Sequence, residues 1–184
     1  MIALDTSPVR LALARHNAMI YGVADRIEFI LADYISFANS LISMSNKDAR
    51  KIDVVFLSPP WGGPEYLEGT EKPTEVSKSS SEDDHPEYSL SDIRPIHGEE
   101  LFKLTRKITS NIAYFLPRNT DLNEISALAS PAFIESKGKG KGKKKIVEGQ
   151  EMVEVEEEWM GSKLKALTCY FGGLVAGQEH LFDK

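Results

Sequence analysis

Four consecutive residues, Ser58-Pro59-Pro60-Trp61, directly follow an apolar run at 51–57. A short polar side chain, two prolines and an aromatic ring together can grip a planar base that carries an exocyclic amine. The serine hydroxyl and the next carbonyl accept hydrogen bonds from the amine, the prolines stiffen the turn, and the ring stacks on the base. The tetrad therefore predicts a catalytic site for methyl transfer to an amino nitrogen. A tight turn with a core tryptophan is the alternative interpretation.

Two acidic residues end other predicted strands. Asp5 follows the apolar run 2–4, and Asp33 follows a predicted strand at 26–31. Ligands of open α/β sheets bind beyond the carboxyl ends of the strands. There, one acid can accept hydrogen bonds from a ribose diol and the next can hold an adenine amine. The chain has no phosphate-binding glycine loop, so the acids favour a nucleoside over a dinucleotide. A cap on the following helix is the alternative interpretation, which we weigh equally for Asp33.

Apolar spacing and stop signals predict the elements that position these residues. Ser7 is expected as the N-cap of the first helix, with Pro8 at its first position and Gly22 after its end. The predicted helices are 9–21, 35–44, 97–109 and 122–129, and the predicted strands are 2–4, 26–31, 51–57, 111–116, part of 147–155, and 163–171.

The alternation of strands and helices predicts an α/β protein with a doubly wound, mostly parallel sheet. The run at 51–57 lacks polar alternation, which indicates a parallel strand buried on both faces. The last two predicted strands are too close in sequence for a crossover helix, so they are expected to pair as a C-terminal antiparallel hairpin.

Composition suits one domain: 184 residues, 41% hydrophobic, with a net charge of −6. Residues 67–92 hold eight acids and two lysines, so this segment alone accounts for the negative excess (2 − 8 = −6). We interpret 67–92 as a flexible acidic insertion and 136–158 as a basic and acidic low-complexity insertion. The lysine run 137–145 is either an RNA tether or nuclear-import signal, or a solvated loop.

Several classes of function are excluded by residue usage. The single cysteine, Cys169, cannot form an internal disulfide or a cysteine-based zinc cluster, and its apolar surroundings indicate a buried thiol. The four histidines have no metal-ligand spacing, so no metal site is predicted. No apolar run approaches the length of a membrane helix, and no signal peptide is recognisable, which predicts an intracellular, reducing setting without a membrane.

One segment, 56–66 (Phe-Leu-Ser-Pro-Pro-Trp-Gly-Gly-Pro-Glu-Tyr), closely resembles the signature of the trimethylguanosine synthases, a family of RNA cap hypermethylases. The resemblance extends over nearly the whole chain outside the two insertions. Weaker supporting segments are 11–18, 21–25, 108–119 and 163–172. The resemblance implies the class I (Rossmann-like) fold of methyltransferases that use S-adenosyl-L-methionine. The implied reaction is methylation of the 2-amino group of a 7-methylguanosine RNA cap, giving a 2,2,7-trimethylguanosine cap.

The resemblance also implies roles for individual residues. Asp5 matches the ribose-binding acid and Asp33 the acid near the adenine, both cofactor-binding. Ser58 with Pro59-Pro60 matches the part that holds the guanine 2-amino group, and Trp61 matches the tryptophan that stacks on the base. Because 7-methylguanine is cationic, an indole face adds cation–π attraction to stacking. Three further residues match positions near the cap triphosphate: Tyr66, Arg118 and Lys165.

Each of these last three has a structural alternative. Tyr66 can be a packing aromatic, Arg118 a surface cap and Lys165 a solvated strand lysine. The partners that the resemblance implies are 7-methylguanosine-capped small nuclear and nucleolar RNAs and components of RNA–protein particles, bound by a monomer. Outside residues 67–92 the charges sum to zero, which is compatible with a short RNA-end ligand. The implied location is the nucleus, in the nucleolus or Cajal bodies, and also the cytoplasm.

The sequence departs from the family pattern at two places. Ser7 stands where the family has a second acid, and the family's first central strand and glycine-rich loop, which cradles the methionine end of the donor, are not found before Met1. We therefore expect residues 1–184 to form a partial methyltransferase domain from a truncated product. Two other functions stay open: a non-catalytic cap-binding fragment, and an amino-methyltransferase acting on an internal RNA base.

Overall fold

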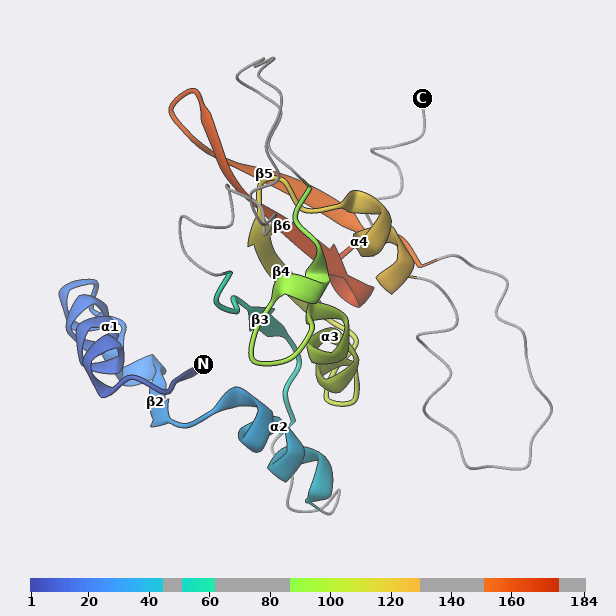
Figure 1. Ribbon diagram of the computed structural model, residues 1–184. Coiled ribbons are helices and arrows are strands. Elements are labelled where there is room, and N and C mark those ends of the chain that lie inside the picture. The colour runs from blue at the N-terminus through green and yellow to red at the C-terminus, as the bar shows by residue number, and fades with distance from the viewer. Residues whose placement is uncertain (45–50, 62–86, 130–150, 176–184) are drawn as a thin grey trace, which may run out of the picture. The chain divides into compact units, whose positions relative to one another are not determined.

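A computed structural model of the chain describes residues 1–44, 51–61, 87–129 and 151–175. Its contacts divide the chain into two compact units, unit 1 at Met1–Lys51 and unit 2 at Ile52–Lys184. Figure 1 shows the helices and strands of both units. Within the described residues, no helix is long and apolar enough to cross a membrane.

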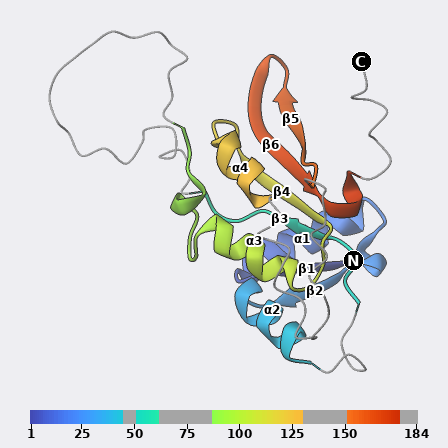
Figure 2. The same ribbon diagram turned by 90° about the vertical axis from the view of Figure 1, so that its right-hand side faces the viewer.

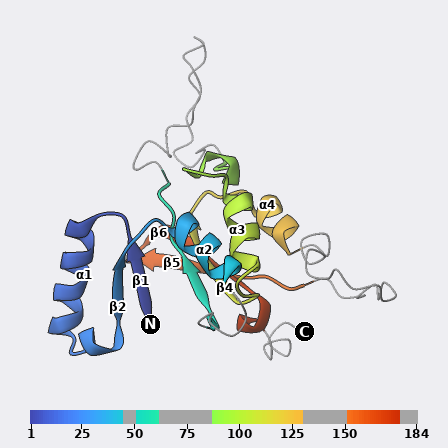
Figure 3. The same cartoon turned by 90° about the horizontal axis from the view of Figure 1, so that it is seen from below.

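Unit 1 contains β1 (Ile2–Asp5), α1 (Pro8–Ile20), the 3-10 helix η1 (Ala24–Arg26), β2 (Glu28–Leu31) and α2 (Tyr34–Ser43). The two strands form a parallel sheet with α1 alongside (Figure 3), in a register that places Asp5 opposite Leu31. Helix α1 begins where the sequence predicts: the Ser7 side chain accepts the Arg10 backbone N–H, and Pro8 occupies the first helical turn.

Few side chains of unit 1 are buried. Among its described residues only Ala18 of α1 and Ala38 of α2 are buried. Large apolar side chains at the end of α1 and beyond it, such as Ile20 and Tyr21, are exposed. No large side chain is therefore fully buried among the described residues of unit 1.

Unit 2 contains β3 (Val55–Leu57), the 3-10 helix η3 (Leu90–Asp92), α3 (Gly98–Arg106), β4 (Ile112–Pro117), α4 (Leu122–Leu128), β5 (Glu154–Met160), β6 (Lys163–Phe171) and the 3-10 helix η5 (Gly172–Leu174). Its four-stranded sheet has the order β3-β4-β6-β5, in which β3 and β4 are parallel and β6 is antiparallel to both of its neighbours. Strand β4 is central and almost wholly buried, whereas β3 and β5 are the edges.

The core of unit 2 is aromatic. Phe102 of α3 stacks on Tyr114 of β4, with ring centroids 6.3 Å apart, and contacts Phe171 of β6 at 4.6 Å. All three side chains are fully buried. The Tyr114 hydroxyl donates to the backbone carbonyl of Gly98 at 3.2 Å, which satisfies a polar group that would be costly to bury alone. These contacts join α3 to the middle of the sheet.

The predicted C-terminal hairpin is confirmed, but its first strand, expected within 147–155, is β5 at Glu154–Met160. Strand β6 occupies the predicted range, and β5 pairs with it in antiparallel register up to Met160 opposite Lys163. The turn between them contains Gly161 at φ +62°, a left-handed conformation that glycine adopts without strain. Figure 2 shows the two strands as one long ribbon pair.

The remaining predictions about the fold need correction in detail. The α/β class and the parallel pairs are found. The described strands form a two-stranded parallel sheet and a four-stranded mixed sheet, rather than one mostly parallel sheet. The strand expected at 51–57 is not buried on both faces: Phe56 is 62% exposed and Leu57 only 4%. Because successive side chains of a strand point to opposite faces, one face of this edge strand is open.

Both predicted insertions extend too far. Residues 87–92 lie inside the acidic insertion by sequence, yet Tyr88 and Leu90 are buried and belong to the fold. The second predicted insertion overlaps β5, whose first residues pair with β6. Both segments were assigned to insertions because they are rich in acids. This composition outweighed the apolar side chains at 88 and 90 and gave no sign that β5 pairs with β6. The rest of both insertions lies outside the described residues.

Candidate functional site

The tetrad Ser58–Trp61 and Arg118 lie at the same end of the four-stranded sheet. The tetrad follows β3 and Arg118 follows β4, and the two strands are parallel, so their carboxyl ends share one edge. Strand β6 runs the opposite way and places its first residues, including Lys165, at this end: its Ala166 pairs with Pro117. We call this end of the sheet, with Ser58, Trp61, Arg118 and Lys165, the tetrad end.

Trp61 is held by a neighbouring strand. Its indole Nε1 donates to the backbone carbonyl oxygen of Phe115 at 3.2 Å, and the two rings lie 4.9 Å apart at an interplanar angle of 38°. Phe115 also contacts Phe56, with ring centroids 6.1 Å apart. The indole is half-buried, so it is both fixed and reachable. This combination suits a stacking platform, whereas the core tryptophan of the alternative interpretation would be fully buried.

The two cations differ in how they are held. Arg118 is half-buried, and its guanidinium donates from Nη1 to the backbone carbonyl of Leu164 at 3.4 Å. Lys165, the next residue along β6, is exposed. Ser58 is also exposed and Pro59 half-buried. The tetrad end therefore presents a hydroxyl, an aromatic face and two positive charges.

Asp5 is the last residue of β1, and its carboxylate is bound by two groups of unit 1. Its carboxylate forms an ion pair with Arg10, whose Nε lies 2.9 Å from Oδ2, and it accepts the backbone N–H of Ser7 at 2.7 Å. The hydrogen bonds from Arg10 and then from Ser7 hold the pKa of Asp5 below its usual range. An ionised carboxylate at a strand end is a strong acceptor for hydroxyl groups.

Asp33 caps a helix. Its Oδ1 accepts the backbone N–H of Ser36 at 2.9 Å and the Ser36 hydroxyl at 3.0 Å, so Asp33 is the N-cap of α2. The capping interpretation of this acid is confirmed, which leaves its second role as a prediction. Asp5 and Asp33 lie at the same end of the β1–β2 sheet, because Ala32 continues the parallel ladder to the Asp5 carbonyl.

The predicted residues therefore form two groups, one in each unit. Unit 2 brings together the four residues of the tetrad end, and unit 1 brings together the two acids. Tyr66 lies outside the described residues. Among the described residues, no group of three or more His, Cys, Asp and Glu could hold a metal ion.

Sequence reasoning missed Phe115 and Tyr88, which both contact Trp61. Phe115 was placed on its strand by the apolar run 111–116, but nothing local indicates its contact with a residue 54 positions away. Tyr88 was assigned to an insertion, and its signal was the apolar pair Tyr88 and Leu90 within the acidic segment.

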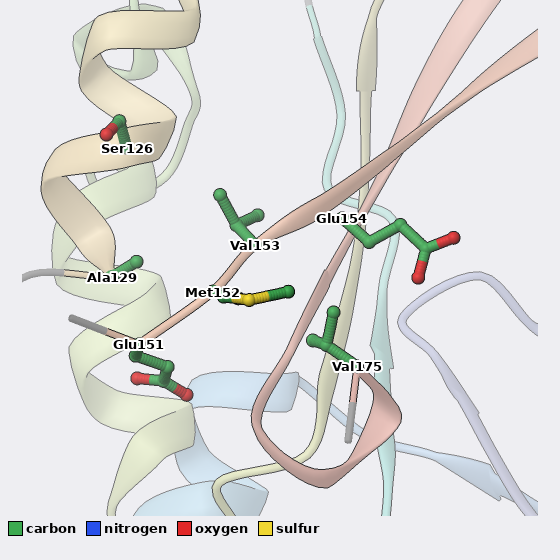
Figure 4. Close-up of a pocket in the computed structure, with 7 residues that line it drawn as sticks. All are labelled: Ser126, Ala129, Glu151, Met152, Val153, Glu154 and Val175. Carbon is green, nitrogen blue, oxygen red and sulfur yellow. The ribbon is translucent and has the colours of Figure 1, made fainter. Parts of the chain in front are cut away.

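A separate hollow of about 370 Å³ lies between the end of α4 and the start of β5 (Figure 4). None of the predicted site residues lines it. Its lining is Ser126, Ala129, Glu151, Met152, Val153, Glu154 and Val175.

Comparison with known proteins gives a consistent result. The family model described as RNA cap guanine-N2 methyltransferase matches residues 1–174. The trimethylguanosine synthase of Schizosaccharomyces pombe is 37% identical over 131 residues, which is 71% of this chain and 46% of that protein. The trimethylguanosine synthase of Saccharomyces cerevisiae is 33% identical over 124 residues, 67% of this chain and 33% of that protein. The matches thus span less than half the length of these relatives.

Proposed function

The chain belongs to the family of RNA cap guanine-N2 methyltransferases, and we propose that it methylates the 2-amino group of a 7-methylguanosine RNA cap with S-adenosyl-L-methionine as donor. The capped end of a small nuclear or nucleolar RNA is the substrate of this proposal. The observation that carries it is the half-buried indole of Trp61, held against Phe115 beside Ser58 and one strand from Arg118.

Trp61 provides the acceptor platform. A 7-methylated guanine carries a positive charge, so stacking on the indole gains cation–π attraction that an unmethylated guanine lacks. Arg118 and Lys165 at the same end of the sheet supply positive charge for the cap phosphates. Arg118 is the more defined of the two, since its guanidinium is oriented by the Leu164 carbonyl.

The chemistry of the two acids fits the nucleoside part of the donor. Asp5 is ionised and is the last residue of β1, where a ribose diol would donate to it. Asp33 offers a carboxylate two residues beyond β2 to an adenine amine. When bound, S-adenosyl-L-methionine would supply an electrophilic methyl group and leave as S-adenosyl-L-homocysteine once its sulfur–methyl bond breaks. Arg10 already occupies the Asp5 carboxylate, so ribose binding requires Asp5 to share or exchange this partner.

Positioning does most of the work at the acceptor. Ser58 and the backbone of the Pro59-Pro60 turn accept hydrogen bonds from the 2-amino group and orient its nitrogen lone pair. Pro59 and Pro60 restrict the turn because each ring fixes φ. The amine becomes acidic when it gains the methyl group, and it then releases one proton to water. The reaction therefore needs no strong base among the residues of the chain.

The test is paired titration of this chain with 7-methyl-GTP and with S-adenosyl-L-methionine, followed by methyl transfer between them. We expect Trp61→Ala to raise the Kd of 7-methyl-GTP about 5- to 150-fold, because base–aromatic stacking is worth about 1–3 kcal/mol. The same change should leave donor affinity unaltered. Asp5→Asn should have the opposite pattern, weakening the donor and leaving 7-methyl-GTP unaffected.

Unmethylated GTP is the matched control ligand. If GTP binds as tightly as 7-methyl-GTP, the cationic base is not recognised and the proposal fails; preference for an internal RNA base would then become the better account. If 7-methyl-GTP binds but the donor does not bind, the chain is a cap-binding fragment without catalysis.

A further inference from the structure

Tyr88 is hydrogen-bonded both to the turn that follows Arg118 and to Trp61. Its backbone N–H donates to the Asn119 carbonyl at 2.8 Å, and its carbonyl accepts the Asp121 N–H at 3.0 Å. These two bonds form a parallel bridge to Thr120, two residues after Arg118. The Tyr88 hydroxyl reaches the other way and donates to the backbone carbonyl of Trp61 at 3.4 Å.

The segment that carries Tyr88 is itself anchored. Glu124 of α4 accepts the Leu90 backbone N–H at 2.6 Å and the Ser89 hydroxyl at 2.8 Å. Hydrogen bonds to a carboxylate are the stronger kind, so this segment is held firmly to α4. Tyr88 is only 4% exposed. Its position is therefore fixed by contacts within the fold.

Trp61 depends on contacts from outside its own turn. Pro59 and Pro60 have no N–H groups, so they cannot donate backbone hydrogen bonds that would tie the turn to the sheet. The indole is held by Phe115, and the main chain of Trp61 is held by Tyr88. Trp61 thus has one hydrogen bond at its indole nitrogen and one at its backbone carbonyl. Together they fix the location and the tilt of the ring.

We propose that Tyr88 is a positioning residue, which sets the location of Trp61 relative to the turn that carries Arg118. This inference rests on the proposed function, since it assigns cap binding to Trp61 and Arg118. Tyr88 does not touch the cap in this proposal; it acts through the Trp61 main chain. Because the hydroxyl contact is long, the expected effect is modest, about a two- to fivefold change in cap affinity.

The experiment uses Trp61 as its own reporter. The chain has two tryptophans, and Trp159 is an exposed residue of the hairpin, so Trp159→Phe leaves Trp61 as the single fluorophore. In this background Tyr88→Phe removes only the hydroxyl. Tyr114→Phe is the matched control, because Tyr114 is also buried and also donates to a backbone carbonyl, that of Gly98.

Three quantities are measured well below the thermal transition of each variant. Without ligand, we expect Tyr88→Phe to raise the acrylamide quenching constant of Trp61; with ligand, to raise the Kd of 7-methyl-GTP two- to fivefold and leave the Kd of S-adenosyl-L-methionine unchanged. Tyr114→Phe should alter none of the three. A purely structural role for Tyr88 would make the two variants alike.

The outcomes separate this inference from the proposed function. If the chain binds 7-methyl-GTP but Tyr88→Phe matches Tyr114→Phe in quenching and in affinity, the positioning role is wrong. If no form of the chain binds 7-methyl-GTP, the proposed function fails, and unchanged quenching would still disprove the positioning role. Glu124→Gln, which weakens the anchor of the same segment, replaces Tyr88→Phe if that variant does not fold, with the same expected direction.

Discussion

Units 1 and 2 both place candidate ligand-binding residues beyond the ends of parallel strands, but they support those residues very differently. In unit 2 the tetrad end is attached to a four-stranded sheet whose central strand packs on Phe102 and Phe171. In unit 1 the two acids are attached to a two-stranded sheet whose buried side chains, among the described residues, are Ala18 and Ala38. Among the described residues, the proposed acceptor-binding residues therefore have a core beneath them, and the two acids proposed for the donor do not.

The difference indicates unequal local stability. A two-stranded sheet without buried large side chains is marginal in water, because hydrophobic burial is the main favourable term of folding. Large apolar side chains of unit 1 remain exposed, with Tyr21 at 82%. We therefore expect unit 2 to form the more stable part of the molecule and unit 1 to open at lower free energy.

The largest expected effect is a core truncation in unit 2. Phe102→Ala removes a fully buried ring that contacts Tyr114 and Phe171, and we expect it to lower the free energy of unfolding by about 3–5 kcal/mol. Urea denaturation followed by circular dichroism measures the change. The matched variant in unit 1 is Leu13→Ala, whose side chain is 58% exposed; it should stay within about 0.5 kcal/mol. Equal losses for the two variants would contradict the comparison.

Amide hydrogen exchange measures the same difference without mutation. The amides of β4 are in the centre of a packed sheet, and those of β2 are in the two-stranded sheet. We expect β4 to exchange at least about 100-fold more slowly than β2 in the ligand-free chain. Addition of S-adenosyl-L-methionine should slow exchange mainly in β1 and β2. Protection in β2 equal to that in β4 would show that unit 1 is stabilised by something other than its own core.

Alkaline pH should destabilise unit 2 through a buried thiol. Burial raises the pKa of Cys169 to about 12, so the folded state keeps a proton that the unfolded chain releases above a pKa of about 8.5. Stability therefore falls as pH rises through the window between these values, by up to about 1.4 kcal/mol per pH unit. Urea midpoints between pH 9 and 11 measure the slope. Cys169→Ala should make it shallower, and an unchanged slope would assign the pH dependence to other groups.

Local signals were sufficient for most elements. The Ser7-Pro8 pair defined the start of α1, and glycines at 161 and 172 flank β6, whose range was predicted to the residue. Local signals failed where a distant partner decides the outcome. Phe56 looked like a core residue because β-branched and apolar neighbours surround it, yet its strand is an edge with one open face.

The candidate site shows the same limit. The chemistry of Ser58–Trp61 and of the strand-end acids is visible in residue types, and parallel topology explains why the tetrad and Arg118 share one edge. The support of Trp61 is not visible, because Phe115 and Tyr88 are far from it in sequence. Asp33 was ambiguous for a physical reason: a carboxylate that follows a strand and precedes a helix is suited to both capping and ligand binding.

The smallest expected effect concerns the exposed ion pair of unit 1. Arg10 is the main reason why the pKa of Asp5 is lowered in the folded state. A carboxyl whose pKa is lower in the folded than in the unfolded state stabilises the fold above the unfolded pKa. This contribution is lost as pH falls through the folded pKa. Arg10→Ala should therefore raise the pKa of Asp5 towards its ordinary value, as measured by NMR titration of the side-chain carboxyl carbon. It should also reduce the acid sensitivity of unit 1. Arg15→Ala, on the same helix, is the control and should leave the pKa of Asp5 unchanged.

Because Arg10 competes with any hydroxyl donor for the same carboxylate, Arg10→Ala should also alter the affinity for S-adenosyl-L-methionine without changing the affinity for 7-methyl-GTP. An equal change in both affinities would mean that the two groups of residues are not independent, and it would contradict the assignment of one ligand to each unit.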